Sequence, residues 1–406
     1  TNKRMDVRYI YLNGGPTAGW TTWTNVPGSR ATTFIRNSQM WGMIPFFVWY
    51  NIPAGSEGYS TDTANAQDAT YMTAYFQNLL FFLNLVNQTA GGDTVGIVLE
   101  PDFIGYQMQN SNGKSPIALT SIAAATSAAY SSGVLTSSDP QYPNTIAGLI
   151  QAINYTIHKN CAYCVFGWQF NLWASPGITV GIPSTGLMHL TDTMGIGAGR
   201  TAIANEANAI ASYYMNGGIL SNGAGFVSVD KYGLDAGASM SGTDPSTSAW
   251  FWNADHWNNY LLFDQTLHTA TGKQVFLWQI PVGHINASQA SDPYTSGGLF
   301  PVLTNTSESW EDSAPTFLLG DTFDTGGGTR LTYFTTNAGG DSSITHSGNL
   351  VTWGSHVAAA KAAGITTILF GAGVGGSTQG VGQPPTDNYW WMNAAQQYYK
   401  NPVSLP

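Results

Sequence analysis

Short apolar runs recur along the chain, separated by stretches long enough to hold a helix or a long loop. Most of these runs are continuous rather than alternating, which is typical of parallel strands buried on both faces. The eight predicted strands are Val7 to Leu12, Ile44 to Tyr50, Val95 to Leu99, Cys164 to Phe170, Phe226 to Val229, Gln274 to Ile280, Thr316 to Leu319 and Thr366 to Phe370.

Between several strands, apolar residues return at helix spacing. The predicted helices are Gln67 to Asn87, Ile146 to Lys159, Ala202 to Met215, His256 to Thr271 and Ser355 to Ala363. This alternation predicts an α/β fold, a (β/α)₈ TIM-type barrel or a distorted relative, as a single catalytic domain over residues 1–406.

Four stretches rich in Gly, Ser and Thr are expected to be long loops, with the functional ones on the carboxyl-terminal rim of the barrel. They are Ser132 to Pro143, Ser239 to Ser248, Thr322 to Ser347 and Gly371 to Thr386.

The third predicted strand ends abruptly in two acids, Glu100 and Asp102, separated by a proline. Side chains alternate along a strand, so both acids are expected to leave the same face at its carboxyl end, where α/β folds place their active sites. The alternative is a structural strand end in which one acid caps the next turn and the other is solvated.

The ends of the other strands also carry amides, carboxylates and indole rings. Sugar faces stack on aromatic rings and sugar hydroxyls need amide or carboxylate partners, so this inventory favours a carbohydrate groove, although a single Trp belongs to the core more often than to a sugar platform. The candidate substrate-binding residues are Tyr50, Asn51, Trp168, Gln169, Asn171, Trp173, Asp235, Trp278, Gln279, His284 and Asp321.

Composition narrows the choice of partner. Only 9% of the 406 residues are charged and 13% are aromatic, and 13 Lys plus Arg against 23 Asp plus Glu give a net charge of −10. We therefore expect a neutral polysaccharide or oligosaccharide as partner, and neither nucleic acid nor a membrane surface. No cofactor and no metal are expected, and the protein is expected to be a monomer.

The only two cysteines form the segment Cys161-Ala162-Tyr163-Cys164, which follows a helical pattern and precedes a strand. A redox motif is expected at the start of a helix rather than at its end, and a zinc site needs two more soft ligands. A local disulfide is the favoured interpretation, with buried free thiols as the alternative. A disulfide and the absence of a signal-like segment before Thr1 favour a processed, secreted protein.

Two segments resemble glycoside hydrolase family 6, the cellobiohydrolases and endoglucanases that act on cellulose. They are Phe46 to Pro53, compared with a Tyr-Asp-Leu-Pro strand end, and Val98 to Asn110, compared with Glu-Pro-Asp-Ser-Leu-Ala-Asn. The resemblance covers roughly residues 40 to 175. It implies that Asp102 is the proton donor and Glu100 its supporting carboxylate.

The chain departs from this family pattern after Pro53, where Ala54 and its neighbours replace acids and Asn51 replaces the family's Asp. A second acid is needed, because glycoside cleavage uses one protonated and one ionised carboxyl group, and burial beside Glu100 is expected to raise the pKa of Asp102. Asp230, at the end of the fifth strand, is the preferred partner, although a salt bridge with Lys231 or an Asx turn is an equal alternative. Asp321 is the reserve.

The sequence thus predicts a secreted glycoside hydrolase acting on cellulose or a related β-glucan. The alternative is a non-catalytic carbohydrate-binding protein on a decayed hydrolase barrel, motivated by Asn51 and Ala54.

Overall fold

Most of the predicted strands are found in a computed structural model that describes residues 4–182, 186–231, 252–282, 284–285, 313–371 and 389–404. Asp235 and the predicted loop from Ser239 to Ser248 lie outside these residues. The chain divides into two compact units. One comprises Met5–Pro176 and Ala209–Ser228 and is called the N-terminal unit here; the other comprises Thr1–Arg4, Gly177–Asn208 and Val229–Pro406 and is called the C-terminal unit.

Parallel strands form the centre of the N-terminal unit. They are β1 (Val7–Asn13), β2 (Ile44–Tyr50), β3 (Val95–Leu99) and β4 (Cys164–Phe170). The register aligns Asn13 with Tyr50 and Leu99 with both Trp49 and Trp168, so the carboxyl ends of the four strands lie at one edge. This edge carries the acids that follow β3.

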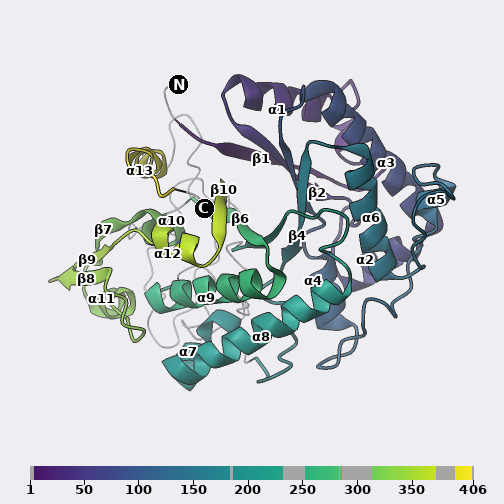
Figure 1. The fold of residues 1–406 in the computed structure, drawn as a ribbon. Coiled ribbons are helices and arrows are strands. Elements are labelled where there is room, and N and C mark those ends of the chain that lie inside the picture. Colours follow the sequence, from purple (N-terminus) through teal and green to yellow (C-terminus); the bar gives the residue numbers. More distant parts are fainter. Residues whose placement is uncertain are drawn as a thin grey trace. The chain divides into compact units, whose positions relative to one another are not determined.

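Helices of the N-terminal unit lie around these strands (Figure 1). They are α1 (Ser29–Met40), α2 (Tyr59–Gln67), α3 (Ala69–Thr89), α4 (Phe103–Asn110), α5 (Ala128–Ser131) and α6 (Ile146–Asn160), with the 3₁₀ turn η1 (Trp20–Thr22). Asp68 caps the N-terminus of α3, because its side chain accepts the backbone N–H groups of Thr70 and Tyr71. Its apolar face packs the Phe82 ring against buried Trp49 and Trp20.

The Cys161–Cys164 disulfide joins the end of α6 to the start of β4, which confirms the favoured interpretation of the two cysteines.

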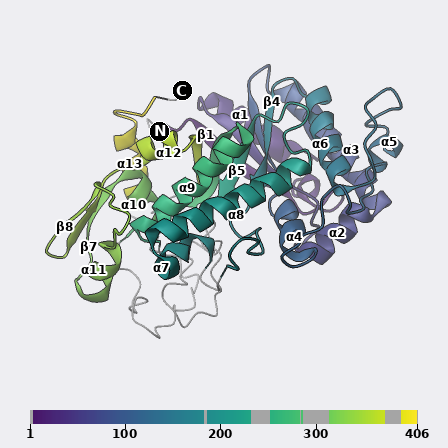
Figure 2. The same cartoon turned by 60° about the horizontal axis from the view of Figure 1, so that its bottom comes forward.

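The C-terminal unit contains strands that pair in parallel and a separate antiparallel sheet. Its elements are η2 (Leu187–His189), α7 (Leu190–Met194), α9 (Ala254–Thr271), β6 (Gln274–Pro281), α10 (Ala314–Leu319), β7 (Asp321–Asp324), α11 (Gly328–Phe334), β8 (Ile344–Ser347), β9 (Leu350–Trp353), α12 (Val357–Ala362), β10 (Ile365–Gly371) and α13 (Trp390–Tyr398). β6 pairs with β10 in parallel, and β7, β9 and β8 pair antiparallel in that order. Figure 2 shows β7 and β8 beside α11.

Two elements, β5 (Phe226–Asp230) and α8 (Ile196–Asn216), cross the division between the units. Hydrogen bonding gives the sheet order β1-β2-β3-β4-β5-β6-β10. Among the described residues this sheet has seven strands, so the α/β class is confirmed and an eight-stranded barrel is not. The expectation of a single catalytic domain stays a prediction.

The predicted strand from Thr316 to Leu319 is wrong, because these residues lie in α10. A four-residue apolar run does not distinguish a strand from a short buried helix, and Pro315 in the first turn favours the helix. The predicted loop from Thr322 to Ser347 is also wrong, because it contains most of β7 and all of α11 and β8.

Within the described residues, no helix combines the length and the apolar character needed to cross a bilayer.

Candidate active site

Both acids after β3 lie in an unusual backbone conformation. The strand ends at Leu99, and Glu100 and Asp102 have φ angles of 39° and 71°. Such angles are uncommon outside Gly and Asn, and they concentrate at functional sites. Because the strand ends before either acid, alternation along it no longer applies, and the two side chains enter different environments rather than leaving one face together.

Glu100 is buried and holds the turn that follows β2. Its carboxylate accepts the backbone N–H groups of Asn51 and Ile52 and the Tyr75 hydroxyl, the last at 2.7 Å. Burial raises the pKa of Glu100 to about 8, against the opposing effect of these donors. Glu100 thus fixes the end of β2 relative to β3, and its role as a supporting carboxylate for Asp102 stays a prediction.

We expect Glu100→Gln to lower the free energy of unfolding by about 1–3 kcal/mol, because the amide group of Gln places N–H donors against buried N–H donors. Urea unfolding at pH 9, above the pKa of Glu100, where its carboxyl group is ionised, measures this change. Asp93→Asn, an exposed acid just before β3, is the control and should leave stability unchanged. Equal stability of Glu100→Gln and wild type would contradict the assigned role.

Asp102 is half-buried and is held by amides from the end of β4. Its Oδ1 accepts the Asn171 side-chain N–H at 2.6 Å and lies 3.5 Å from the Gln169 amide nitrogen. The Tyr214 hydroxyl donates to Asn171 Oδ1 at 2.9 Å, which turns the Asn171 amino group toward Asp102. These contacts fix the carboxyl group while leaving it partly open to solvent.

A close approach of the backbone supports this arrangement. A Cβ at Gly105 would lie 2.6 Å from Asn171 Oδ1 and 2.9 Å from the Trp173 ring, so only glycine fits there. The ring centroids of Trp173 and Tyr106, both half-buried, lie 4.9 Å apart, and the Tyr106 backbone N–H donates to the Asp102 carbonyl. An aromatic pair therefore lies close to Asp102.

Tyr50 links Asp102 to a further acid, Glu57. The Tyr50 hydroxyl donates to Glu57 Oε2 at 2.5 Å and lies 3.4 Å from Asp102 Oδ2, which places the two carboxylates within about 6 Å. Burial, followed by the negative charges of Asp102 and Glu57, raises the pKa of Tyr50 well above its ordinary value. The phenol therefore stays protonated and can donate a hydrogen bond at any physiological pH.

Glu57 was not among the residues predicted from the sequence. It lies in the exposed turn after β2, where the family pattern places acids closer to the proline. The signal in the sequence is that Glu57 is the first acid after Tyr50-Asn51-Ile52-Pro53, although it does not align with the acids of the family pattern.

Asp62, in the first turn of α2, is a second acid that the sequence analysis missed. It is fully buried, and burial together with the negative charge of Glu57 raises its pKa to about 7, while the backbone of Gly58 acts in the opposite direction. Its charge also reaches Tyr50 and Glu100. The site thus contains a buried carboxyl group that is partly protonated near neutral pH.

This pKa shift predicts a pH dependence of stability. The pKa of Asp62 is 3.8 in the unfolded chain and about 7 in the folded protein, so folding favours its protonated form. This contribution to the free energy of unfolding is complete below pH 3.8 and is lost as the pH rises through about 7. Asp62→Asn removes the ionisable group, so we expect a flatter stability profile and a gain of roughly 1–2 kcal/mol at pH 8. Thermal unfolding from pH 4 to 8 measures it, and an unchanged profile would refute it.

Several predicted substrate-binding residues of the N-terminal unit are buried. Trp168 is 1% exposed and donates its indole N–H to Asn154, and Asn51 is 0% exposed and donates to the Leu12 carbonyl. Neither offers a surface to a sugar. Gln169 and Asn171 are also buried and reach Asp102 instead, so of the predicted aromatic platforms in this unit Trp173 remains accessible.

The other predicted residues lie in the C-terminal unit. Asp230 ends β5 and is 3% exposed, and Trp278 is buried in β6 at 1% exposure. Gln279 follows with a φ of 52°. His284 and Asp321 line a common pocket, described below. Asp230 and Asp102 belong to different units, and their pairing stays a prediction.

One histidine cluster has the composition of a metal site. Side-chain atoms of His189, Asp192 and His256 lie within 4.8 Å of one another. His256 Nδ1 accepts the backbone N–H of Asn253, which places the ring proton on Nε2, facing Asp192 at 2.9 Å. Hydrogen bonds therefore account for this cluster, whose members the sequence analysis did not connect.

Comparison with known proteins gives partial structural matches. No family model and no curated protein matches the chain. Among solved structures, cellobiohydrolase II from Humicola insolens is 12% identical, with 65% of this chain and 60% of that chain covered and a TM-score of 0.32. A fungal β-1,4-galactanase structure is 10% identical, with coverages of 69% and 64% and a TM-score of 0.36. An endoglucanase from Humicola insolens is 14% identical, with coverages of 66% and 65% and a TM-score of 0.33.

In each case the chain spans less than two thirds of the matched protein. The two Humicola insolens matches agree with the distant resemblance to glycoside hydrolase family 6 in residues 40 to 175. Their TM-scores are too low to carry an argument, so the case for a function rests on the site itself.

Proposed function

We propose that the protein is a glycoside hydrolase that cleaves a neutral β-linked polysaccharide, cellulose or a related β-glucan, with Asp102 as the proton donor. The observation that carries this proposal is the setting of Asp102. It is a half-exposed carboxyl group beyond the carboxyl end of a parallel strand, held by Asn171 and connected through Tyr50 to Glu57.

In the proposed reaction, Asp102 donates its proton to the glycosidic oxygen as the bond from that oxygen to the anomeric carbon breaks. The Asp230 carboxylate takes a proton from the attacking water, whose oxygen forms the new bond to the anomeric carbon. Asp102 leaves the step ionised, Asp230 leaves it protonated, and a water-borne proton exchange restores both. The expected separation of the two carboxyl groups is about 6.5–9.5 Å, which corresponds to inversion at the anomeric carbon.

Glu57 supports the donor in this proposal. Its negative charge, transmitted by the short hydrogen bond from Tyr50, favours the protonated form of a carboxyl group about 6 Å away. Asn171 keeps that group oriented toward the substrate. Glu57 and Asn171 therefore act through Asp102.

The aromatic pair favours a saccharide as the ligand. Trp173 and Tyr106 present half-buried rings near Asp102, and apolar sugar faces stack on such rings. The low charge content of the chain agrees with a neutral polymer. We further propose that the protein acts outside the cell as a monomer, where the Cys161–Cys164 disulfide is stable.

Reducing-sugar release from a panel of neutral polysaccharides, with product chromatography, tests the proposal. Wild type should release reducing ends from at least one β-glucan, and Asp102→Asn should not. The second candidate function, a carbohydrate-binding protein without activity, is favoured by the uncharged Asn51 and Ala54 at the family's acidic positions. Oligosaccharide binding without any release would establish it and refute the hydrolase.

A further inference from the structure

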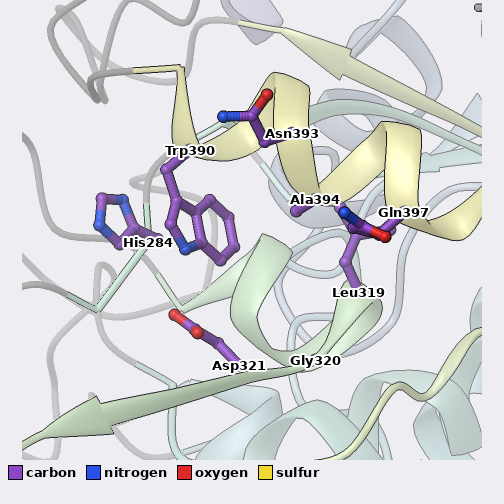
Figure 3. A pocket seen from close by; sticks show the side chains of 8 residues that line it. All are labelled: His284, Leu319, Gly320, Asp321, Trp390, Asn393, Ala394 and Gln397. Carbon is purple, nitrogen blue, oxygen red and sulfur yellow. The ribbon is translucent and has the colours of Figure 1, made fainter.

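A pocket of about 530 Å³ in the C-terminal unit has the chemistry of a ligand site (Figure 3). One wall is a single face of α13, since Trp390, Asn393, Ala394 and Gln397 follow one another at i, i+3, i+4 and i+7. The other wall is Leu319, Gly320 and Asp321, where α10 ends and β7 begins, together with His284. The volume lies within the range of small-molecule sites.

The aromatic part of the pocket consists of two stacked rings. The His284 and Trp390 rings are stacked, with centroids 4.5 Å apart and an angle of 7° between their planes. In Figure 3 the indole points from α13 toward Asp321, and the Asp321 carboxylate accepts hydrogen bonds from Trp390 and from the backbone N–H of Thr322. Burial raises the pKa of Asp321 despite these donors. The indole is therefore held in place before any ligand arrives.

The polar part of the pocket is available to a ligand. Asn393 and Gln397 are exposed, and within the described part of the chain neither side-chain amide has a protein hydrogen-bond partner. Each amide offers both donors and an acceptor, which matches neighbouring sugar hydroxyls. Among the described residues that line the pocket none is Lys or Arg, so an anion would meet the Asp321 carboxylate without a compensating charge from them.

We propose that this pocket binds a neutral saccharide, with Trp390 as the stacking platform and Asp321, Asn393 and Gln397 as hydroxyl partners. The proposal rests on the pocket's own side chains and does not require that Asp102 be catalytic. An organic cation is the competing ligand. A tetraalkylammonium group, however, has no hydrogen-bond acceptor and would leave the amide donors of Asn393 and Gln397 without partners.

Hydrogen–deuterium exchange of the full chain, read by mass spectrometry, tests the proposal because its readout is local. The experiment uses the Asp102→Asn variant, so that the ligands are not cleaved. The probes are cellotetraose, laminaritetraose and β-1,4-galactotetraose, with tetramethylammonium as the cationic probe. At least one tetrasaccharide should slow exchange in peptides covering residues 389–400 and 313–324. Adding Trp390→Ala should remove this protection and weaken binding to the pocket by about threefold to tenfold.

Two neighbouring glutamines provide a matched comparison. Gln397→Ala should reduce protection of residues 389–400, whereas Gln396→Ala should not, because Gln396 contacts the Arg4 backbone instead of the pocket. Protection by tetramethylammonium alone, no protection by any tetrasaccharide, or protection that survives Trp390→Ala would overturn the proposal. Protection at 389–400 in a protein whose wild type releases no reducing sugar would support the pocket and refute the hydrolase.

Discussion

Asp102→Asn is expected to lower the rate of polysaccharide hydrolysis by about 10² to 10⁴-fold, which is the usual contribution of a general acid. Asparagine keeps the shape of the side chain and can still contact Tyr50, but it has no acidic proton for the leaving oxygen. Oligosaccharide affinity should change little, because the rings of Trp173 and Tyr106 are untouched. Initial rates on the best β-glucan of the panel and calorimetric binding of its tetrasaccharide measure the two effects.

A matched control comes from the opposite end of the same strand. Asp93 is exposed just before β3 and accepts a hydrogen bond from Gln39, so Asp93→Asn should keep full activity. Near-normal turnover by a correctly folded Asp102→Asn variant would remove Asp102 from the mechanism. On substrates with an activated leaving group, which need little acid assistance, Asp102→Asn should lose much less activity than it loses on the polysaccharide.

Asp230→Asn by itself is expected to lower the rate of polysaccharide hydrolysis by about 10² to 10⁴-fold. Without a carboxylate base, no group takes the proton from the water as it attacks. This loss should persist on substrates with an activated leaving group, because the base acts on the water and not on the leaving oxygen. Azide added to Asp230→Ala should restore turnover and give a glycosyl azide of inverted configuration. Full activity of Asp230→Asn would pass the role to another acid.

Glu57→Gln distinguishes a supporting acid from a base. If Glu57 favours the protonated form of Asp102 through Tyr50, the variant should lose less activity than Asp230→Asn, and the alkaline limb of its pH–rate profile should move to lower pH. If instead Glu57→Gln shows the larger loss and Asp230→Asn is active, Glu57 is the base and the assignment of Asp230 is wrong.

The sequence alone determined the four strands and the two longest helices of the N-terminal unit, α3 and α6, whereas its other helices were not predicted. Continuous apolar runs predicted β1 to β4 within one or two residues of their observed ends, because burial on both faces leaves a pattern that needs no tertiary information. The position of the two cysteines at the end of a helical pattern and the lack of further soft ligands also favoured the Cys161–Cys164 disulfide. The acids after β3 were recognisable for the same reason, as they interrupt an apolar run at the carboxyl end of a strand.

Only the tertiary structure decided what each polar residue does. Glu100 and Asp102 are two positions apart, yet one is buried under the β2 turn and the other faces solvent, because the strand ends before both and each has a positive φ. Glu57 joins the site through a side-chain hydrogen bond that no spacing rule encodes. Likewise, His284 and Trp390 are far apart in sequence and stack in one pocket. The run from Thr316 to Leu319 is too short for its own pattern to distinguish a strand from a helix, and with Pro315 in the first turn it forms a helix. Periodicity records which residues are buried, whereas contacts between distant residues depend on how the elements pack.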